Sequence, residues 1–251
     1  MTTYRLDIAY DGSGFRGWAK QEGLRTVQAE IEDSLGRLFG APTPLTVAGR
    51  TDAGVHATGQ VASFSAAKAP PANLRRALNA LTPADISITA AAPAAEDFDA
   101  RRQATSRRYR YRLLLGDVPS PFERRYSMHL SYPLDRGLLD AAAAQIVGTH
   151  DFTAFTPTDT EHVRFERRVL DAGWRGPEAG AGAAEEILSF EVEADAFMRN
   201  MVRVLVGTML EIGTGRRDPD SLGTLLSGRP RPEAGETAPA RGLFLIGVSY
   251  R

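Results

Sequence analysis

The stretch Leu45-Thr-Val-Ala-Gly-Arg-Thr-Asp-Ala-Gly-Val-His-Ala-Thr-Gly-Gln-Val-Ala-Ser-Phe64 contains two apolar runs with a polar, glycine-rich segment between them. Leu45–Val47 and Gln60–Phe64 have the composition of short strands. The segment between them, residues 49–56, holds two Gly together with Arg, Thr, Asp and His. We expect two strands joined by a loop that carries polar side chains, because functional groups are often found on loops that a rigid scaffold positions.

The segments around this stretch give the first hundred residues a regular order of elements. A strand over Tyr4–Tyr10 is followed by a helix that Thr26 caps, with its apolar residues at helical spacing. After the two strands, a helix begins near Pro70, and Asp85–Thr89 alternates as a last strand. The predicted order is strand, helix, strand, strand, helix, strand, which is that of a ferredoxin-like unit.

The second half repeats this order. The predicted elements are the strand Arg107–Leu115, the helix Leu138–Val147, a hairpin of Val169–Trp174 and Ile187–Ala194 around a flexible Gly176–Ala184 linker, the helix Met198–Ile212, a short helix capped by Asp218, and the strand Leu243–Tyr250. The long helix has an apolar stripe that should face the core. Residues 229–240 form a Pro/Gly-rich loop. We therefore expect an α+β protein of two ferredoxin-like halves, residues 1–104 and 105–251, each with a four-stranded antiparallel sheet.

The composition limits the class of protein. The 251 residues contain no Cys, which excludes disulfides, thiolate metal sites and Cys nucleophiles. No apolar run approaches the ~18 residues of a membrane span. The first residues lack the apolar core of a signal peptide, so we expect a cytoplasmic protein. The four His have no metal-ligand spacing, and we expect no metal site.

Positive charge is concentrated locally although the whole chain is nearly neutral. With 30 basic and 31 acidic residues the net charge is −1, which argues against a nucleic-acid binder. Lys20 and Lys68 are the only Lys, however, and eight Arg fall between Arg101 and Arg125 against two acids. Arg binds phosphate bidentately, so this cluster indicates nucleic acid more strongly than the total excludes it. A solvated charged face is the alternative.

Asp52 is the first candidate for chemistry. It lies two residues from Arg50, and a nearby cation lowers the pKa of a carboxylate. An ionised carboxylate acts as a nucleophile toward an electrophilic carbon or as a general base. The alternative is a turn Asp that precedes a permissive Gly. Arg199 and Arg203, one helical turn apart beside the apolar stripe, need a carboxylate partner, for which Asp52 is one candidate.

The strand Arg107–Leu115 is the second candidate. Its period of two places Tyr109 and Tyr111 on one face. The other face then carries three arginines, Arg108, Arg110 and Arg112. Stacking of a base on a Tyr is worth ~1–3 kcal/mol, and Arg on adjoining surfaces holds phosphate. Alternatively, both Tyr pack in a core and the arginines are solvated.

The loop and this strand belong to a longer series of motifs. In chain order these are Tyr10-Asp-Gly-Ser-Gly-Phe-Arg-Gly-Trp18, Gly49-Arg-Thr-Asp-Ala-Gly-Val-His-Ala-Thr-Gly-Gln60, Arg107-Arg-Tyr-Arg-Tyr111, Asp151-Phe-Thr-Ala-Phe155, Phe197-Met-Arg-Asn-Met-Val-Arg203 and Gly242-Leu-Phe-Leu245. Their combination and order resemble the tRNA pseudouridine synthase A family over almost the whole chain. The Arg-Thr-Asp-Ala-Gly-Val-His run is the most specific of them.

The resemblance implies an isomerase that converts uridine to pseudouridine in the anticodon arm of tRNA, at positions 38 to 40. It implies no cofactor, no metal, no membrane, and a homodimer. It also implies the pseudouridine synthase fold, with the antiparallel sheets of the two halves joined side by side, helices on one face and a central RNA-binding cleft. Asp52 matches the catalytic aspartate, nucleophile or base, and Arg203 matches the basic residue that pairs with it. Tyr109 matches the tyrosine that stacks on the target base, and Arg50 is expected to contact RNA or support the flipped-out state.

Two other classes of function remain as alternatives. A non-catalytic RNA-binding protein built from two ferredoxin-like modules keeps the Arg and Tyr surfaces but gives Asp52 no role. A carboxylate-dependent hydrolase of nucleosides or glycosides needs a second acid, and the sequence does not place one.

Overall fold

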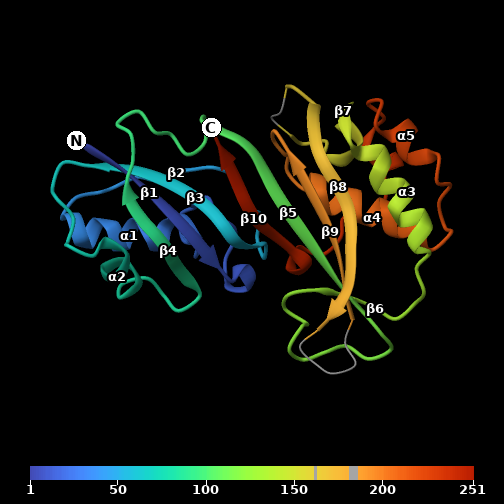
Figure 1. Ribbon diagram of the computed structural model, residues 1–251, viewed down its shortest axis with the longest axis horizontal. Coiled ribbons are helices and arrows are strands. Elements are labelled where there is room, and N and C mark those ends of the chain that lie inside the picture. The colour runs from blue at the N-terminus through green and yellow to red at the C-terminus, as the bar shows by residue number, and fades with distance from the viewer. Residues whose placement is uncertain (161–162, 181–185) are drawn as a thin grey trace. The chain divides into compact units, whose positions relative to one another are not determined.

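The computed structural model describes residues 1–160, 163–180 and 186–251 (Figure 1). The chain forms two compact units, one of Met1–Thr105 with Phe244–Arg251 and the other of Ser106–Leu243. The last strand is therefore grouped with the first unit. The two contiguous halves expected from the sequence, 1–104 and 105–251, stay a prediction about domains.

The first unit has the expected order of elements and one further strand, which was expected in the second half. They are β1 (Thr2–Tyr10), α1 (Val27–Phe39), β2 (Thr46–Val47), β3 (His56–Ala66), α2 (Leu74–Asn79), β4 (Ile86–Pro93) and, from the end of the chain, β10 (Leu243–Tyr250). The strand order is β4-β1-β3-β10, with β2 paired to β3. β1 is antiparallel to both of its neighbours, whereas β10 is parallel to β3.

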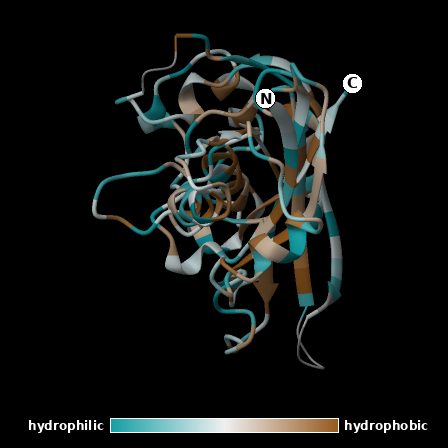
Figure 2. Cartoon of the chain, turned by 90° about the vertical axis from the view of Figure 1, so that its left-hand side faces the viewer, coloured by the Kyte–Doolittle hydropathy of each residue, from teal (hydrophilic) through white to brown (hydrophobic). Residues whose placement is uncertain are grey.

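Local sequence explains why α1 forms where it does. The Thr26 hydroxyl accepts the amide hydrogen of Ala29 at 3.4 Å, which confirms the predicted N-cap. The helix ends at Gly40, whose φ of 75° favours glycine. Ile31 and Leu35 on its inner face are fully buried. In Figure 2, which colours the chain by hydropathy, strands are banded in brown and teal, as alternation of apolar and polar residues requires.

The second unit contains the other described strands and, among its described residues, three α-helices. They are β5 (Ala104–Leu115), β6 (Met128–Leu130), α3 (Arg136–Ile146), β7 (Gly148–Asp151), β8 (Glu166–Ala179), β9 (Glu186–Ala194), α4 (Met201–Gly213) and α5 (Ser221–Leu225). The strand order is β5-β9-β8-β7, with β6 added parallel to β5. β5, β9, β8 and β7 pair antiparallel in turn, and α3 packs against β8 and α4. The α+β prediction is confirmed.

Several element boundaries differ from the prediction. α2 begins at Leu74 because the Asn73 side chain caps it. β8 continues to Ala179, so the start of the expected Gly176–Ala184 linker is a strand, and residues 181–185 lie outside the described residues. The short strands β6 and β7 were not predicted. Among the described residues, no helix is both long and apolar enough to cross a membrane.

α4 differs from the prediction in its burial. The sequence predicts one apolar stripe, yet eleven of its thirteen residues are buried. The residues off the stripe are covered because a later segment of the chain, residues 233–239, hydrogen-bonds along that side of the helix. The spacing of apolar residues within α4 does not predict this contact, because residues 233–239 lie further along the chain.

Candidate active site

Asp52 lies in a tight loop of the first unit, between β2 and β3. Its backbone carbonyl accepts the amide hydrogen of Val55 at 3.1 Å. Gly54, inside this turn, has a φ of 78°, a left-handed conformation that favours glycine. Asp52 is partly exposed, whereas its neighbour Thr51 and Val55 are buried. The loop is therefore anchored on both sides of a carboxylate that solvent reaches.

A buried polar network holds the loop from below. The hydroxyls of Tyr10 and Thr51 are 2.7 Å apart, and the Gln60 amide donates to the Gly49 carbonyl at 2.7 Å and to the Tyr10 oxygen at 3.4 Å. Gln60 is fully buried. Burial raises the pKa of the Tyr10 hydroxyl to about 12, so it stays protonated at neutral pH. The network is thus uncharged, and it fixes the backbone immediately before Asp52.

The segment after β1 presses against the same loop. The Trp18 amide donates to the Thr51 carbonyl at 3.0 Å. A Cβ at Gly17 would lie 2.9 Å from that carbonyl oxygen, and a Cβ at Gly12 would overlap the carbonyl oxygen of Val55. These glycines allow two backbone segments to touch. The Tyr10–Trp18 motif is therefore the support of the Asp52 loop.

His56 fastens the end of the loop. Its buried Nδ1 accepts the Gly12 amide hydrogen at 3.1 Å and lies 3.2 Å from a carboxylate oxygen of Asp11. The imidazole stacks on the Phe244 ring, with centroids 4.5 Å apart. The sequence pattern alone indicates no role for His56. The structure makes it a joint between the segment after β1, the loop and β10.

Arg50 precedes Asp52 by two residues in the same loop, and its side chain is exposed. The expectation that its positive charge holds the Asp52 carboxylate ionised stays a prediction.

Arg203 lies near the start of α4 in the second unit. Its Nε donates to the Ala238 carbonyl at 2.7 Å, and its Nη1 donates to the Asn200 side chain at 2.8 Å. Asn200 precedes the helix in a left-handed conformation with φ 62°. The guanidinium is half-buried and held by neutral oxygens in a defined direction.

Tyr109 lies on the face of β5 that the sequence assigned to it. It is 7% exposed, and its ring packs edge-on against Phe197 with centroids 4.9 Å apart. Tyr111 on the same face is fully buried, so the predicted alternation is confirmed. Burial raises the pKa of the Tyr111 hydroxyl, and the positive charge of Arg203 opposes this rise.

The opposite face of β5 is a row of ion pairs. Arg108 and Arg110 stand directly across from Glu193 and Glu191 of β9 in the sheet register. Their guanidinium nitrogens lie 2.8 and 2.7 Å from those carboxylates, and Arg112 pairs with Glu123 at 2.9 Å. Three of the eight arginines counted from 101 to 125 are therefore paired with acids, which weakens the interpretation of this face as a phosphate surface.

The four predicted residues are distributed between the units. Arg50 and Asp52 belong to the first, and Tyr109 and Arg203 belong to the second. The supporting residues that sequence reasoning missed include Gln60, for which the available signal is a Gln directly before the apolar Val61 and Ala62. Among the described residues, no group of three or more His, Asp or Glu is arranged to hold a metal ion.

Comparison with known proteins gives a consistent result. The family described as "tRNA pseudouridine synthase" matches residues 8–101 and 142–251. This match includes Arg50, Asp52 and Arg203, and it leaves out Tyr109. Proteins named "tRNA pseudouridine synthase A" are similar over their full length: 43% identity in Moorella thermoacetica, covering all of both chains, and 40% in Latilactobacillus sakei, covering 99% of this chain and 98% of the relative. The relative from Myxococcus xanthus is 38% identical, covering all of this chain and 93% of its own.

Proposed function

Because this chain belongs to the tRNA pseudouridine synthase family, we propose that it converts uridine to pseudouridine in the anticodon arm of tRNA, at positions 38, 39 and 40. In this reaction the bond from C1′ to N1 breaks, the uracil turns over, and C5 bonds to C1′. The observation that carries the proposal is the presentation of Asp52: a partly exposed residue on a loop that hydrogen bonds hold before it, at Gly49 and Thr51, and after it, at His56.

Asp52 is the catalytic residue of the proposed reaction. C1′ and C6 are both electrophilic enough for attack by a carboxylate, and the same group serves as a base in the competing scheme. The anchored loop supports either role, since a catalytic carboxylate has to be held in place as it meets the reacting atom. Arg203 is proposed to pair with this carboxylate, its direction set by Ala238 and Asn200.

The target uridine has to leave its stack before Asp52 reaches it, at a cost of a few kcal/mol. Tyr109 is proposed to stack on the extruded base and offset part of this cost. Because Phe197 already contacts the ring and little of it is exposed, stacking uses the small exposed part of the ring or follows a movement of Phe197. Arg50, exposed beside the loop, is proposed to contact the RNA or support the flipped-out state.

The proposal extends to the assembly. We place the enzyme in the cytoplasm as a homodimer in which one tRNA contacts both subunits. Sedimentation of the protein with and without tRNA measures both stoichiometries, and a monomer that converts tRNA at full rate would contradict the dimer.

Mapping of pseudouridine tests the reaction. Unmodified tRNA is incubated with the wild type, Asp52→Asn, or Asp33→Asn, an exposed carboxylate of the same unit that serves as the control. Carbodiimide treatment and reverse transcription should then show stops at positions 38, 39 and 40 for the wild type and Asp33→Asn only. Full activity of Asp52→Asn would contradict the assignment. Release of free uracil would indicate the hydrolase, and binding by the wild type without conversion would indicate the RNA-binding protein.

A further inference from the structure

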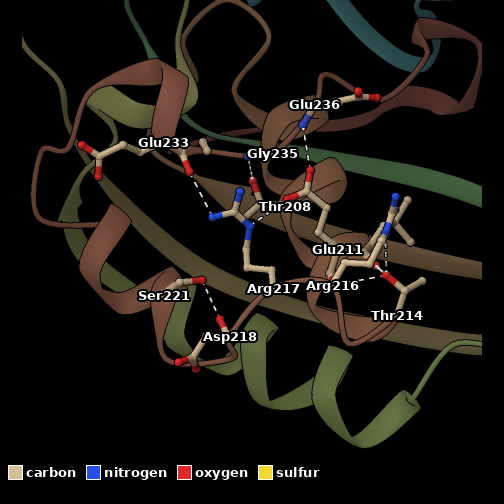
Figure 3. A network of polar contacts seen from close by, with 12 residues as sticks. Thr208, Glu211, Thr214, Arg216, Arg217, Asp218, Ser221, Glu233, Gly235 and Glu236 are labelled. Carbon is tan, nitrogen blue, oxygen red and sulfur yellow. Dashed lines mark hydrogen bonds and ion pairs between the residues drawn. The ribbon is translucent and has the colours of Figure 1, made fainter.

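A segment that we call the strap, residues 233–239, lies along α4 in the second unit. Figure 3 shows its first part: the Gly235 amide donates to the Thr208 hydroxyl at 3.0 Å, and the Glu236 amide donates to the Glu211 carboxylate at 3.3 Å. Further along, the Ala238 amide donates to the Arg203 carbonyl at 3.1 Å. Three strap amides therefore bond to the helix, at Thr208, Glu211 and Arg203.

The strap lies directly on the helix backbone. A Cβ at Gly207 would overlap the carbonyl oxygen of Glu236, and a Cβ at Gly235 would lie 2.8 Å from the Cα of Thr208. Arg217 adds a bond to the Glu233 carbonyl at 3.0 Å (Figure 3). Because the strap approaches the helix so closely and makes these hydrogen bonds, it is held in one position along α4.

The far end of the strap is fixed by Tyr111. Its hydroxyl donates to the Pro239 carbonyl at 2.8 Å, and its fully buried ring lies against Gly242, where a Cβ would come within 2.7 Å of the ring. Tyr111 thus holds the peptide bond between Pro239 and Ala240, one residue beyond the Ala238 carbonyl. Ala238 itself contacts Arg203 twice, through its amide and through the carbonyl that receives Nε.

We propose that Tyr111 is a positioning residue for Arg203, acting through the strap. The proposal rests on the proposed function, in which Arg203 pairs with Asp52. If Tyr111 only filled space, its hydroxyl could donate to any nearby acceptor. Here it donates to the Pro239 carbonyl, next to the Ala238 carbonyl that orients the Arg203 guanidinium. Loss of the Tyr111 hydroxyl therefore allows the Ala238 carbonyl to shift. A displaced catalytic group loses rate steeply, by up to ~100-fold per ångström.

A double-mutant cycle tests the proposal. The single-turnover rate of pseudouridine formation is measured for the wild type, Tyr111→Phe, Arg203→Ala and the double variant, with tRNA affinity and unfolding midpoints on the same preparations. Tyr111→Phe should lower the rate about tenfold at unchanged tRNA affinity. In the Arg203→Ala background it should have no further effect, because there is no guanidinium left to aim. A purely structural role would lower the rate by the same factor in both backgrounds.

Two further variants make the test specific. Ser221→Ala also removes a hydroxyl that donates to a backbone carbonyl, that of Asp218 (Figure 3), and serves as the control with unchanged rate. Thr208→Val removes the hydroxyl that receives the Gly235 amide and replaces Tyr111→Phe if that variant does not fold; it should show the same dependence on Arg203.

The outcomes are distinct. A wild-type rate for Tyr111→Phe together with a slow Arg203→Ala overturns this inference alone. If Tyr111→Phe lowers the rate by the same factor in the wild type and in Arg203→Ala, this inference alone is likewise overturned. A wild-type rate for Arg203→Ala overturns both this inference and the role of Arg203 in the proposed function.

Discussion

The loop of Asp52 and the helix of Arg203 are held by different means. Under the loop lies a network of side chains: the Tyr10 hydroxyl and the Gln60 amide reach it from within the core of the first unit. Along α4 lies a backbone segment: the carbonyl of Ala238, on a strap that lies directly on the helix, accepts the Nε of Arg203. Removal of a polar atom therefore tests the support of the loop, and addition of a methyl group tests the contact of the strap with the helix. The following predictions test this difference, from the largest expected effect on the protein to the smallest.

Addition of a methyl group to α4 gives the largest effect. Gly207→Ala should lower the free energy of unfolding by about 3 kcal/mol, because its Cβ overlaps the Glu236 carbonyl and both atoms belong to packed backbone. Without the strap contact, the same change would stabilise the helix by about 1 kcal/mol. Urea unfolding of the variant therefore tests the contact by the sign of the change.

Gly36→Ala in α1 is the matched control for this sign. The nearest atom to its Cβ would be the Ala41 carbonyl oxygen at an ordinary 3.7 Å. This variant should be more stable than the wild type by about 0.5–1 kcal/mol. Stabilisation by both substitutions would show that the strap does not confine α4.

The Tyr10 hydroxyl, which supports the loop, should make the free energy of unfolding depend on pH in the alkaline range. An unfolded Tyr ionises near pH 10, whereas folded Tyr10 keeps its proton to about pH 12, because burial raises its pKa. Folding is therefore favoured below pH 10 and loses stability as the pH rises from 10 to 12, by up to about 3 kcal/mol. Tyr10→Phe should lose less stability over this range, which urea unfolding at pH 9 and pH 11 measures.

The alkaline loss will not vanish in Tyr10→Phe. Burial also raises the pKa of the Tyr111 hydroxyl, with the charges of Arg203 and Arg241 opposing it, so a second contribution of the same sign remains in the second unit. The combined variant Tyr10→Phe and Tyr111→Phe should lose least. An alkaline loss as large in Tyr10→Phe as in the wild type would show that the hydroxyl under the loop is not buried as described.

The smallest effects concern surface arginines. Arg110 is paired with Glu191, so Arg110→Ala should leave the salt dependence of tRNA binding unchanged and change stability by about 1 kcal/mol or less. Arg50 is exposed beside the Asp52 loop, and Arg50→Ala should reduce the slope of log K against log salt by about 1. Filter binding over a range of salt concentrations measures both. A reduced slope for Arg110→Ala alone would reverse the assignment of RNA contacts.

These arginines also show what sequence does and does not predict. The period of two in residues 107–115 correctly places Tyr109 and Tyr111 on one face, because side chains alternate along any strand. It does not reveal that Glu193 and Glu191 stand opposite Arg108 and Arg110. That depends on the register between two strands about eighty residues apart, which no local pattern specifies.

For the candidate site, too, local sequence predicts some features and not others. Thr26 as a helix cap and the loop around Asp52 are local features, and local sequence predicts them. Resemblance supplies Arg203 and Tyr109, since spacing alone leaves their roles open. The residues that hold the site in place could not be predicted: Tyr10 and Ala238 come from segments distant in the sequence, and only the packed fold brings them to Thr51 and Arg203.

The most direct test of the central claim, that Asp52 performs the chemistry, is the single-turnover conversion of unmodified tRNA by Asp52→Asn. This substitution keeps the size of the side chain and removes only its charge and basicity. Binding of tRNA and the unfolding midpoint are measured on the same preparation. We predict wild-type affinity and stability with no pseudouridine formed. Pseudouridine formation at the wild-type rate would contradict the account.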